Sequence, residues 1–147
     1  MQTPIIRLAT VHDIPQIVAM GERFVDETSY RVHLTKNPTQ MADLAARLIC
    51  GPEGLLLVAE RGDTLIGMIG FYLFHHVFSG ELTATDVFWW VNPEHRGIGV
   101  RLLRAAERWA LTHGAVVLQM VAPTDHVGAF YERLGYHKVE AAYQKRV

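Results

Sequence analysis

The feature that most constrains this chain is the segment Val91–Leu103, which reads Val-Asn-Pro-Glu-His-Arg-Gly-Ile-Gly-Val-Arg-Leu-Leu. Its residue types predict a strand, a glycine turn and then a helix, because proline ends a strand and apolar residues recur at helical spacing after the glycines. The first N–H groups of a helix lack intrahelical partners and lie at the positive end of its dipole. The segment therefore predicts a pyrophosphate site, to which Arg96 adds a charge.

Two other phosphate-binding loops are excluded by the residues present. The dinucleotide fingerprint needs another glycine three residues after Gly99, where Leu102 stands, and a Walker loop needs Gly-Lys-Ser or Gly-Lys-Thr, which the segment lacks. One alternative stays open at this point. The glycines could serve only the backbone geometry of a tight turn.

The composition fits one folded domain over residues 1–147, with half of the residues hydrophobic and 20% charged. A net charge of −1 without a run of one sign argues against a nucleic-acid or membrane partner. The single cysteine, Cys50, excludes an internal disulfide. We see no targeting segment and no apolar stretch near the ~20 residues that span a bilayer, so we expect a cytoplasmic protein.

Hydrophobic periodicity predicts a mixed α/β (α+β) domain in the order β-α-α-β-β-β-α-β-α-β. Strands are expected at Ile5–Ala9, Leu55–Glu60, Thr64–Phe74, Glu81–Val91, Ala115–Val121 and Tyr136–Arg146. Helices are expected at Asp13–Glu27, at Pro38–Cys50, from the glycine turn to His113, and from Thr124 or Asp125 to Leu134.

The turn resembles the signature of the GNAT superfamily of N-acetyltransferases, Arg/Gln-x-x-Gly-x-Gly/Ala. Residues 96–101 match it in all but the last position, where Arg101 replaces a small residue. The segment Ala129-Phe-Tyr-Glu-Arg-Leu-Gly-Tyr136 resembles the family's Phe-Tyr-Glu-Lys-x-Gly-Phe, and Ile6–Asp13 is similar to its opening. The resemblance covers nearly the whole chain.

The resemblance implies a GNAT-like fold in which the fourth and fifth strands splay apart, here Phe88–Val91 and Val117–Val121, with acetyl-CoA as cosubstrate between them. Backbone N–H groups of the fourth strand would stabilise the oxyanion that develops on the acetyl group. The residues that would hold the cosubstrate are Trp89, Trp90, Val91, Arg96, Gly97, Ile98, Gly99, Val100, Arg101 and Thr124. Because many relatives pair through their sheets, a homodimer is also an expectation.

Acetyl transfer to an amine needs a base, because an alkylamine with a pKa of about 10.4 is mostly protonated at pH 7, and an acid for the departing thiolate. The resemblance implies Tyr131 as the acid; the alternative is an aromatic side chain packed beside Phe130. Asp86 is the candidate base or amine anchor, because an unpaired charge in an apolar strand is costly. Counting by twos from Val91 places Asp86 on the opposite face, unless a β-bulge shifts the register.

Tyr30 and His75 are candidates for the acceptor site, with packing as their alternative role, and no cluster of residues at ligand spacing suggests a metal. The sequence thus predicts direct transfer of an acetyl group, in a ternary complex, to a primary amine of a small molecule or protein. Two alternatives stay open. One is a non-catalytic acyl-CoA-binding module that uses its acceptor face for a protein partner, and the other is a purely structural α/β domain.

Overall fold

The computed structural model describes residues 2–147, whose strands form one five-stranded sheet in the order β1-β2-β3-β4-β5. Neighbouring strands are antiparallel, except that β4 and β5 run parallel. The strands are β1 (Ile5–Leu8), β2 (Gly54–Arg61), β3 (Thr64–His75), β4 (Leu82–Val91) and β5 (Val117–Gln119).

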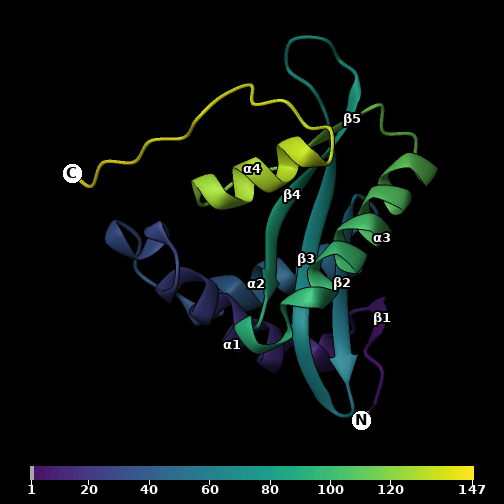
Figure 1. The fold of residues 1–147 in the computed structure, drawn as a ribbon, viewed down its shortest axis with the longest axis vertical. Coiled ribbons are helices and arrows are strands. Elements are labelled where there is room, and N and C mark those ends of the chain that lie inside the picture. The colour runs from purple at the N-terminus through teal and green to yellow at the C-terminus, as the bar shows by residue number, and fades with distance from the viewer. Residues whose placement is uncertain (1) are drawn as a thin grey trace.

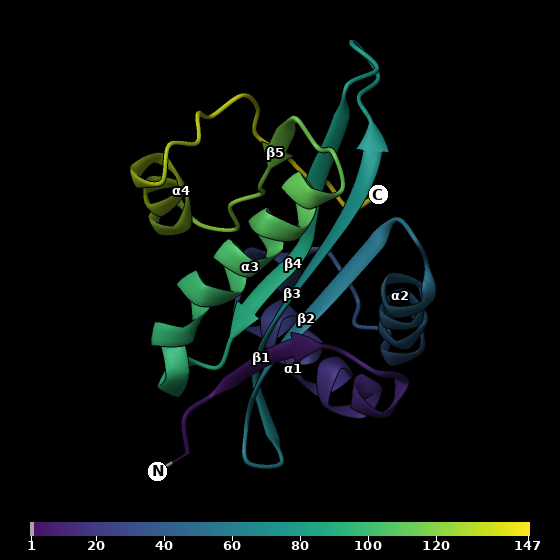
Figure 2. The same cartoon turned by 90° about the vertical axis from the view of Figure 1, so that its right-hand side faces the viewer.

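Helices cover both faces of the sheet (Figure 1). Figure 2 shows α1 and α2 on one face and α3 and α4 on the other. The α-helices are α1 (Ile14–Asp26), α2 (Pro38–Cys50), α3 (Gly99–Thr112) and α4 (Asp125–Arg133), and the short 3-10 segments are η1 (Val11–Asp13), η2 (Ser29–Val32) and η3 (Pro93–Ile98). Among the described residues, no helix combines the length and apolar character needed to cross a membrane.

Each face of the sheet has its own hydrophobic cluster. Phe71, Leu102 and Leu103 belong to the cluster under α3, whereas Leu48 and Trp90 belong to the cluster under α1 and α2. Successive side chains of a strand point to opposite faces. This is why β2 and β3 read as continuous apolar runs: both faces of these central strands are buried.

A β-bulge interrupts β4 at Val87. Phe71 of β3 lies opposite Asp86, but the preceding residue, Gly70, lies opposite Phe88, so Val87 is an extra residue in β4. Residues opposite one another in an antiparallel pair point to the same face. Asp86 therefore points to the α3 face, as Phe71 does, and the bulge that the alternation count required is present.

The expected strand at Tyr136–Arg146 is wrong. Residues 136–147 contain no strand and leave the end of α4 as an extended tail (Figure 1). Alternation of apolar and polar residues makes a strand only beside a partner edge and a core. Val139 and Tyr143 are 80% and 92% exposed, so in this chain the alternating segment packs against neither a strand edge nor the core. The fifth strand is also shorter than the expected Ala115–Val121.

A bidentate ion pair fixes β1 to the start of α1. Arg7 donates from Nη1 and Nη2 to the two carboxylate oxygens of Asp13, at 2.8 and 2.9 Å. The backbone N–H of Thr10 donates to the same carboxylate at 2.8 Å, and Asp13 is buried. The hydrogen bonds from Arg7 lower the pKa of Asp13 below its ordinary value of 3.8.

Asp13→Asn is expected to lower the free energy of unfolding at neutral pH by about 2 kcal/mol, because the charged hydrogen bonds from Arg7 are lost. Because the pKa of the Asp13 carboxyl is lower in the folded than in the unfolded protein, its ionised form stabilises the fold at pH values above its ordinary pKa. This contribution is lost as pH falls through the folded-state pKa. Urea unfolding should therefore show a difference between wild type and variant at pH 7 that shrinks as pH falls below the ordinary pKa of 3.8. Asp26→Asn, which removes an exposed pair with Lys36, is the matched control and should change little. A difference that persists in acid would contradict the assignment.

Candidate functional site

The ladder between β4 and β5 opens after three residue pairs. Thr83–Thr85 pair with Val117–Gln119, and no pairs follow. Beyond them, the Asp86 carboxylate accepts the backbone N–H of Val121 at 3.0 Å, so a side chain takes the place of the next backbone contact. The end of β4, Phe88–Val91, is thus unpaired on this side. This is the divergence of the two strands that the sequence analysis expected.

Asp86 lies at the point where the strands part. Burial raises the pKa of Asp86 from 3.8 to about 7, although the hydrogen bond from Val121 favours the charged form. Burial, and after it the charge of Asp86, raises the pKa of Tyr30 on η2 and of Tyr131 on α4. These three groups, which come from three separate segments of the chain, therefore belong to one electrostatic environment.

Tyr131 is buried next to this opening. Its phenol donates to the carbonyl of Val121 at 3.3 Å, and its ring stacks on Trp89 with centroids 5.9 Å apart. Burial, followed by the charge of Asp86, raises the pKa of Tyr131 well above its ordinary value of 10. The phenol is therefore protonated at neutral pH. The backbone of Val121 thus contacts both side chains, Asp86 through its N–H and Tyr131 through its carbonyl.

The turn between β4 and α3 contains two glycines, Gly97 and Gly99, which differ in the space available for a side chain. Neither has a positive φ, so backbone geometry alone does not require glycine there. A Cβ on Gly99 would lie 3.3 Å from the Trp89 ring and 3.4 Å from the side chain of Val91, so packing accounts for this glycine. A Cβ on Gly97 would meet no atom within 4 Å. Nothing within the chain requires glycine at position 97, and a ligand has room to approach its backbone.

The remaining residues of the turn offer backbone groups or charge. Ile98 is buried in the core below α3, so only its backbone is available to a ligand. Val100 and Arg101 are exposed in the first turn of α3, where N–H groups lack intrahelical partners. The side chain at position 101 therefore points to solvent and leaves the backbone of the helix start accessible.

A pocket of about 330 Å³ beside the turn is lined by basic side chains, namely Arg61, His95, Arg96 and Arg101, together with Glu94. The Nη1 atom of Arg61 lies 3.1 Å from Nδ1 of His95. Arg61 belongs to the β2–β3 hairpin, some thirty residues before the turn in sequence, and no local pattern pointed to it. Only the strand pairing brings it here. The positive charge suits an anionic ligand.

Trp90 points to the face opposite Trp89. The guanidinium groups of Arg23 and Arg96 both lie over its ring, with their Cζ atoms 5.6 and 5.5 Å from the ring centroid. Its indole N–H donates to the side chain of Asn92 at 3.0 Å. Arg96 thus has a cation–π partner on the α1 face, and of Trp90 only the backbone faces the opening.

Thr124 and Tyr30 come from separate segments of the chain, the start of α4 and the 3-10 segment η2. Thr124 is the N-cap of α4, and its hydroxyl accepts the backbone N–H of Val127 at 3.3 Å. Tyr30 is half-buried, with its ring centroid 5.7 Å from that of Phe24. The hydroxyl of Thr124 keeps a proton that it can donate, and the charge of Asp86 contributes to the raised pKa of Tyr30.

His75 lies farther away, at the exposed end of β3. Its Nδ1 atom is 3.0 Å from the carbonyl oxygen of Gly80, within the β3–β4 hairpin. Its cross-strand partner is Leu82, four residues before Asp86, which corresponds to about 13 Å along a strand. The structure therefore brings Tyr30 to Asp86 and leaves His75 at the tip of the hairpin.

The chain belongs to the Acetyltransferase (GNAT) family, whose sequence profile matches residues 20–136. This match confirms the resemblance that the glycine turn and the segment around Tyr131 indicated. Acetyl-CoA is the acyl donor that membership of this family implies. No curated protein sequence matches the chain significantly.

Solved structures share the fold at low sequence identity. A predicted acetyltransferase with acetyl-CoA from Clostridium acetobutylicum has a TM-score of 0.81 and 12% identity, over 98% of this chain and 96% of its own. A transcriptional regulator from Bacillus halodurans C-125 has a TM-score of 0.79 and 22% identity, over 99% and 100%. A ribosomal-protein-alanine N-acetyltransferase from Brucella melitensis biovar Abortus 2308 has a TM-score of 0.72 and 18% identity, over 99% of each chain.

The residues at the opening fit acetyl-CoA. The indole N–H of Trp89 is buried beside the opening and has no hydrogen-bond partner in the protein. The free space at Gly97 and the arginines around the turn suit a pyrophosphate. No group of three or more metal-ligating side chains occurs among the described residues.

Gly97→Val is expected to raise the dissociation constant of acetyl-CoA about tenfold or more and to leave the free energy of unfolding almost unchanged. The new side chain would occupy the space beside the backbone, where its Cβ would meet no protein atom within 4 Å. Gly99→Val is the matched control, because its side chain collides with Trp89 and should also lower stability. Isothermal titration and urea unfolding of both variants measure the two effects. Unchanged affinity in Gly97→Val would remove the pyrophosphate from this turn.

Proposed function

We propose that the protein transfers the acetyl group of acetyl-CoA directly to a primary amine bound in the same complex. The observation that carries this proposal is that the two backbone groups of one residue, Val121, contact Asp86 and Tyr131 where β4 and β5 part: its N–H donates to Asp86, and its carbonyl accepts from Tyr131. A group that accepts a proton and a group that donates one thus flank the same opening. Acetyl-CoA supplies an activated thioester, and the chain supplies the two proton transfers.

Asp86 acts as the base in this proposal. A carboxylate with a pKa of about 7 is half ionised near neutrality, and it accepts a proton more readily than an ordinary exposed carboxylate would. It takes the proton that the acceptor nitrogen loses as the C–N bond forms. Tyr30, on the α1 side of Asp86, is placed to contact the acceptor in this reading.

Tyr131 acts as the acid. Its phenol gives its proton to the sulfur as the C–S bond breaks. Stacking on Trp89 fixes the ring, while the 3.3 Å bond to the Val121 carbonyl is long enough to be exchanged for a closer partner. Trp89, Trp90 and Val91 would hold the cosubstrate through their backbone, residues 96–101 would hold its pyrophosphate, and Thr124 would contact it from α4.

The acceptor is an amine of a small molecule or of a protein. The fold of this chain is shared with an acetyltransferase described as acting on a ribosomal-protein alanine, which supports a peptide amine as one candidate. The described residues at the opening offer one carboxylate and aromatic rings, which suit an ammonium group with an apolar neighbour. Initial rates over a panel of amines, with the free thiol measured, test the proposal.

A non-catalytic acyl-CoA-binding module is the second candidate. It is supported by the shared fold with a chain described as a transcriptional regulator. The two candidates differ in one measurement. Saturable binding of acetyl-CoA in titration calorimetry, without thiol release for any amine, would favour the module, whereas amine-dependent thiol release establishes the enzyme.

A further inference from the structure

We propose that the pocket between the β2–β3 hairpin and the β4–α3 turn binds a dianionic phosphate group, in addition to the pyrophosphate at the backbone of the turn. The pocket has a volume of about 330 Å³, and the side chains of Arg61, Arg96 and Arg101 are part of its lining. Two sources offer such a group. One is the 3′-phosphate on the ribose of acetyl-CoA, which rests on the proposed function, and the other is a free small phosphate, which does not.

Arg61 has more hydrogen-bond donors than the protein satisfies. Its Nε atom is buried and has no hydrogen-bond partner in the protein. A guanidinium group has several N–H donors and no acceptor, and among the described residues the side chain of Arg61 makes one hydrogen bond, to His95, and no ion pair. A buried donor of a charged group is costly to leave unpaired, so Arg61 indicates a ligand that supplies an acceptor.

The contact between Arg61 and His95 defines a second donor in the pocket. Nη1 of Arg61 lies 3.1 Å from Nδ1 of His95, and because the guanidinium can only donate, Nδ1 accepts. The ring proton of neutral His95 is therefore on Nε2, which is a donor. Arg61 ends β2 and His95 belongs to η3, so this contact also links two walls of the pocket that are distant in sequence.

The positive charge of the pocket is not neutralised within the protein. Glu94 is the one acidic residue among the described residues that line it, and its Oε1 atom pairs with Nη1 of Arg23 at 3.6 Å. The cation–π contact with Trp90 orients Arg96 without cancelling its charge. Three guanidinium groups thus accompany one carboxylate that is itself paired. A phosphate group carries about two negative charges at pH 7 and forms strong hydrogen bonds with guanidinium groups.

The lining residues place the pocket on the side of β4 that faces away from the β4–β5 opening. Pro4 precedes β1, Arg61 ends β2 and Ile66 belongs to β3, and these strands lie across β4 from β5 in the sheet. The other lining residues, 94–98 and 101, belong to the turn and the start of α3. A ligand here contacts the turn but lies outside the opening. The position therefore suits a distal phosphate of the cosubstrate or a separate anion, and not the reacting thioester.

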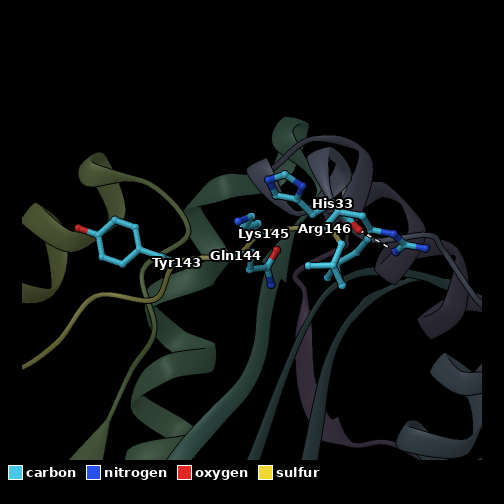
Figure 3. Close-up of a pocket in the computed structure, with 7 residues that line it drawn as sticks. His33, Tyr143, Gln144, Lys145 and Arg146 are labelled. Atoms are coloured by element: carbon cyan, nitrogen blue, oxygen red, sulfur yellow. Dashed lines mark hydrogen bonds between the residues drawn. The ribbon is translucent and has the colours of Figure 1, made fainter.

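A larger cleft, of about 570 Å³, lacks these features. It lies between the extended tail and residues His33 and Leu34. Figure 3 shows Tyr143 pointing away from His33 and Arg146, and the guanidinium group of Arg146 already donates to the carbonyl of His33 at 3.0 Å. Neither of the two buried side-chain donors that lack a partner among the described residues lines this cleft. The pocket beside the turn is therefore the better anion site.

Titration calorimetry of the full chain with inorganic phosphate tests the site and needs no turnover. Arg61→Gln should raise the phosphate dissociation constant about tenfold or more, because charged hydrogen bonds are lost. Arg47→Gln removes the same charge from an exposed position on α2, on the other face of the sheet, and should leave phosphate binding nearly unchanged. Arg101→Gln alters an exposed side chain of the pocket and should also weaken binding, which guards against a folding defect in Arg61→Gln.

Two further titrations distinguish the sources. If the 3′-phosphate of the cosubstrate occupies the pocket, acetyl-CoA should bind about tenfold more tightly than acetyl-3′-dephospho-CoA, Arg61→Gln should remove this difference, and inorganic phosphate should compete with acetyl-CoA. If a free phosphate occupies it, both cosubstrates should bind equally, and inorganic phosphate should bind the chain saturated with acetyl-CoA in a manner that depends on Arg61.

Equal affinities of Arg61→Gln and Arg47→Gln for inorganic phosphate and for acetyl-CoA would overturn the site. All of these measurements report binding. Their failure is therefore distinct from a lack of amine-dependent thiol release, which would contradict the proposed function and leave the phosphate titration valid.

Discussion

Tyr131→Phe is expected to lower kcat for acetyl transfer by roughly 10²- to 10³-fold, while the KM for acetyl-CoA changes about twofold at most. The phenylalanine ring preserves the stack on Trp89, and only the hydroxyl that donates to the Val121 carbonyl is lost. A proton donor acts in the transition state, so its loss appears in kcat. Steady-state kinetics with a thiol-specific reagent measure both parameters.

Tyr136→Phe is the matched control for this experiment. The two tyrosine rings lie 5.7 Å apart, but the hydroxyl of Tyr136 donates to Glu107 on α3, whereas that of Tyr131 donates to the Val121 carbonyl. Its removal should affect stability by about 1 kcal/mol and leave kcat nearly unchanged. If both variants lost activity equally, a general effect on packing would be the better explanation.

The pH dependence of the Tyr131→Phe defect gives a second criterion. A thiol has an ordinary pKa of about 8.5, so a departing thiolate needs a proton less as the solution becomes more alkaline. The ratio of wild-type to variant kcat should therefore shrink between about pH 7 and pH 9. A constant ratio would indicate that the hydroxyl acts otherwise, for example by orienting the thioester.

Local sequence signals predicted most of the elements because their causes are local. The helix expected at Pro38–Cys50 has these bounds in the structure. Asn37 caps it by accepting the N–H of Gln40 at 3.0 Å, and Gly51 follows its last residue. The phosphate-binding turn was recognisable for the same reason, since its proline, glycines and helical spacing are consecutive in the chain.

Features that depend on distant partners could not be predicted. The bulge at Val87 is defined by the register against β3, so strict alternation placed Asp86 on the wrong face. The contact of Arg61 with His95 depends on the same strand pairing. The tail has the alternation of a strand, but a strand also requires an edge, and nothing in the local pattern says where that edge lies.

The placement of Asp86 links these observations to the chemistry. Without the bulge, its carboxylate would point to the α1 face, away from α4. With it, the carboxylate reaches the backbone of Val121, whose carbonyl contacts Tyr131. One extra residue in β4 therefore brings the proposed base and the proposed acid to the same opening, at the cost of burying a carboxylate.

Asp86→Asn is expected to lower kcat by roughly 10²-fold or more and to remove the acid limb of the pH–rate profile. A base must be ionised to act, and the pKa of Asp86 is about 7, so wild-type kcat should rise with pH through neutrality and then level off. Glu81→Gln, at an exposed turn before the same strand, is the control and should keep this limb. If the limb survives in Asp86→Asn, another group is the base.

The division of the effect between kcat and KM separates the two roles considered for Asp86. A base acts on the transition state, so its loss lowers kcat and leaves the acceptor KM nearly constant. An anchor for the ammonium group binds the ground state, so its loss raises the acceptor KM and alters kcat less. Substrate saturation curves for wild type and variant, recorded on both sides of pH 7, distinguish these outcomes.

The same variant should be more stable than wild type in mildly alkaline solution. The pKa of Asp86 is raised from 3.8 to about 7 on folding, so the folded chain binds more protons between these values and stability falls as pH rises through them. Asparagine keeps an oxygen for the Val121 N–H without a charge. Unfolding at about pH 8 should therefore show Asp86→Asn stabilised by a few kcal/mol, a difference that vanishes near about pH 3. Lost activity together with gained stability would show that the buried charge is kept for chemistry and not for folding.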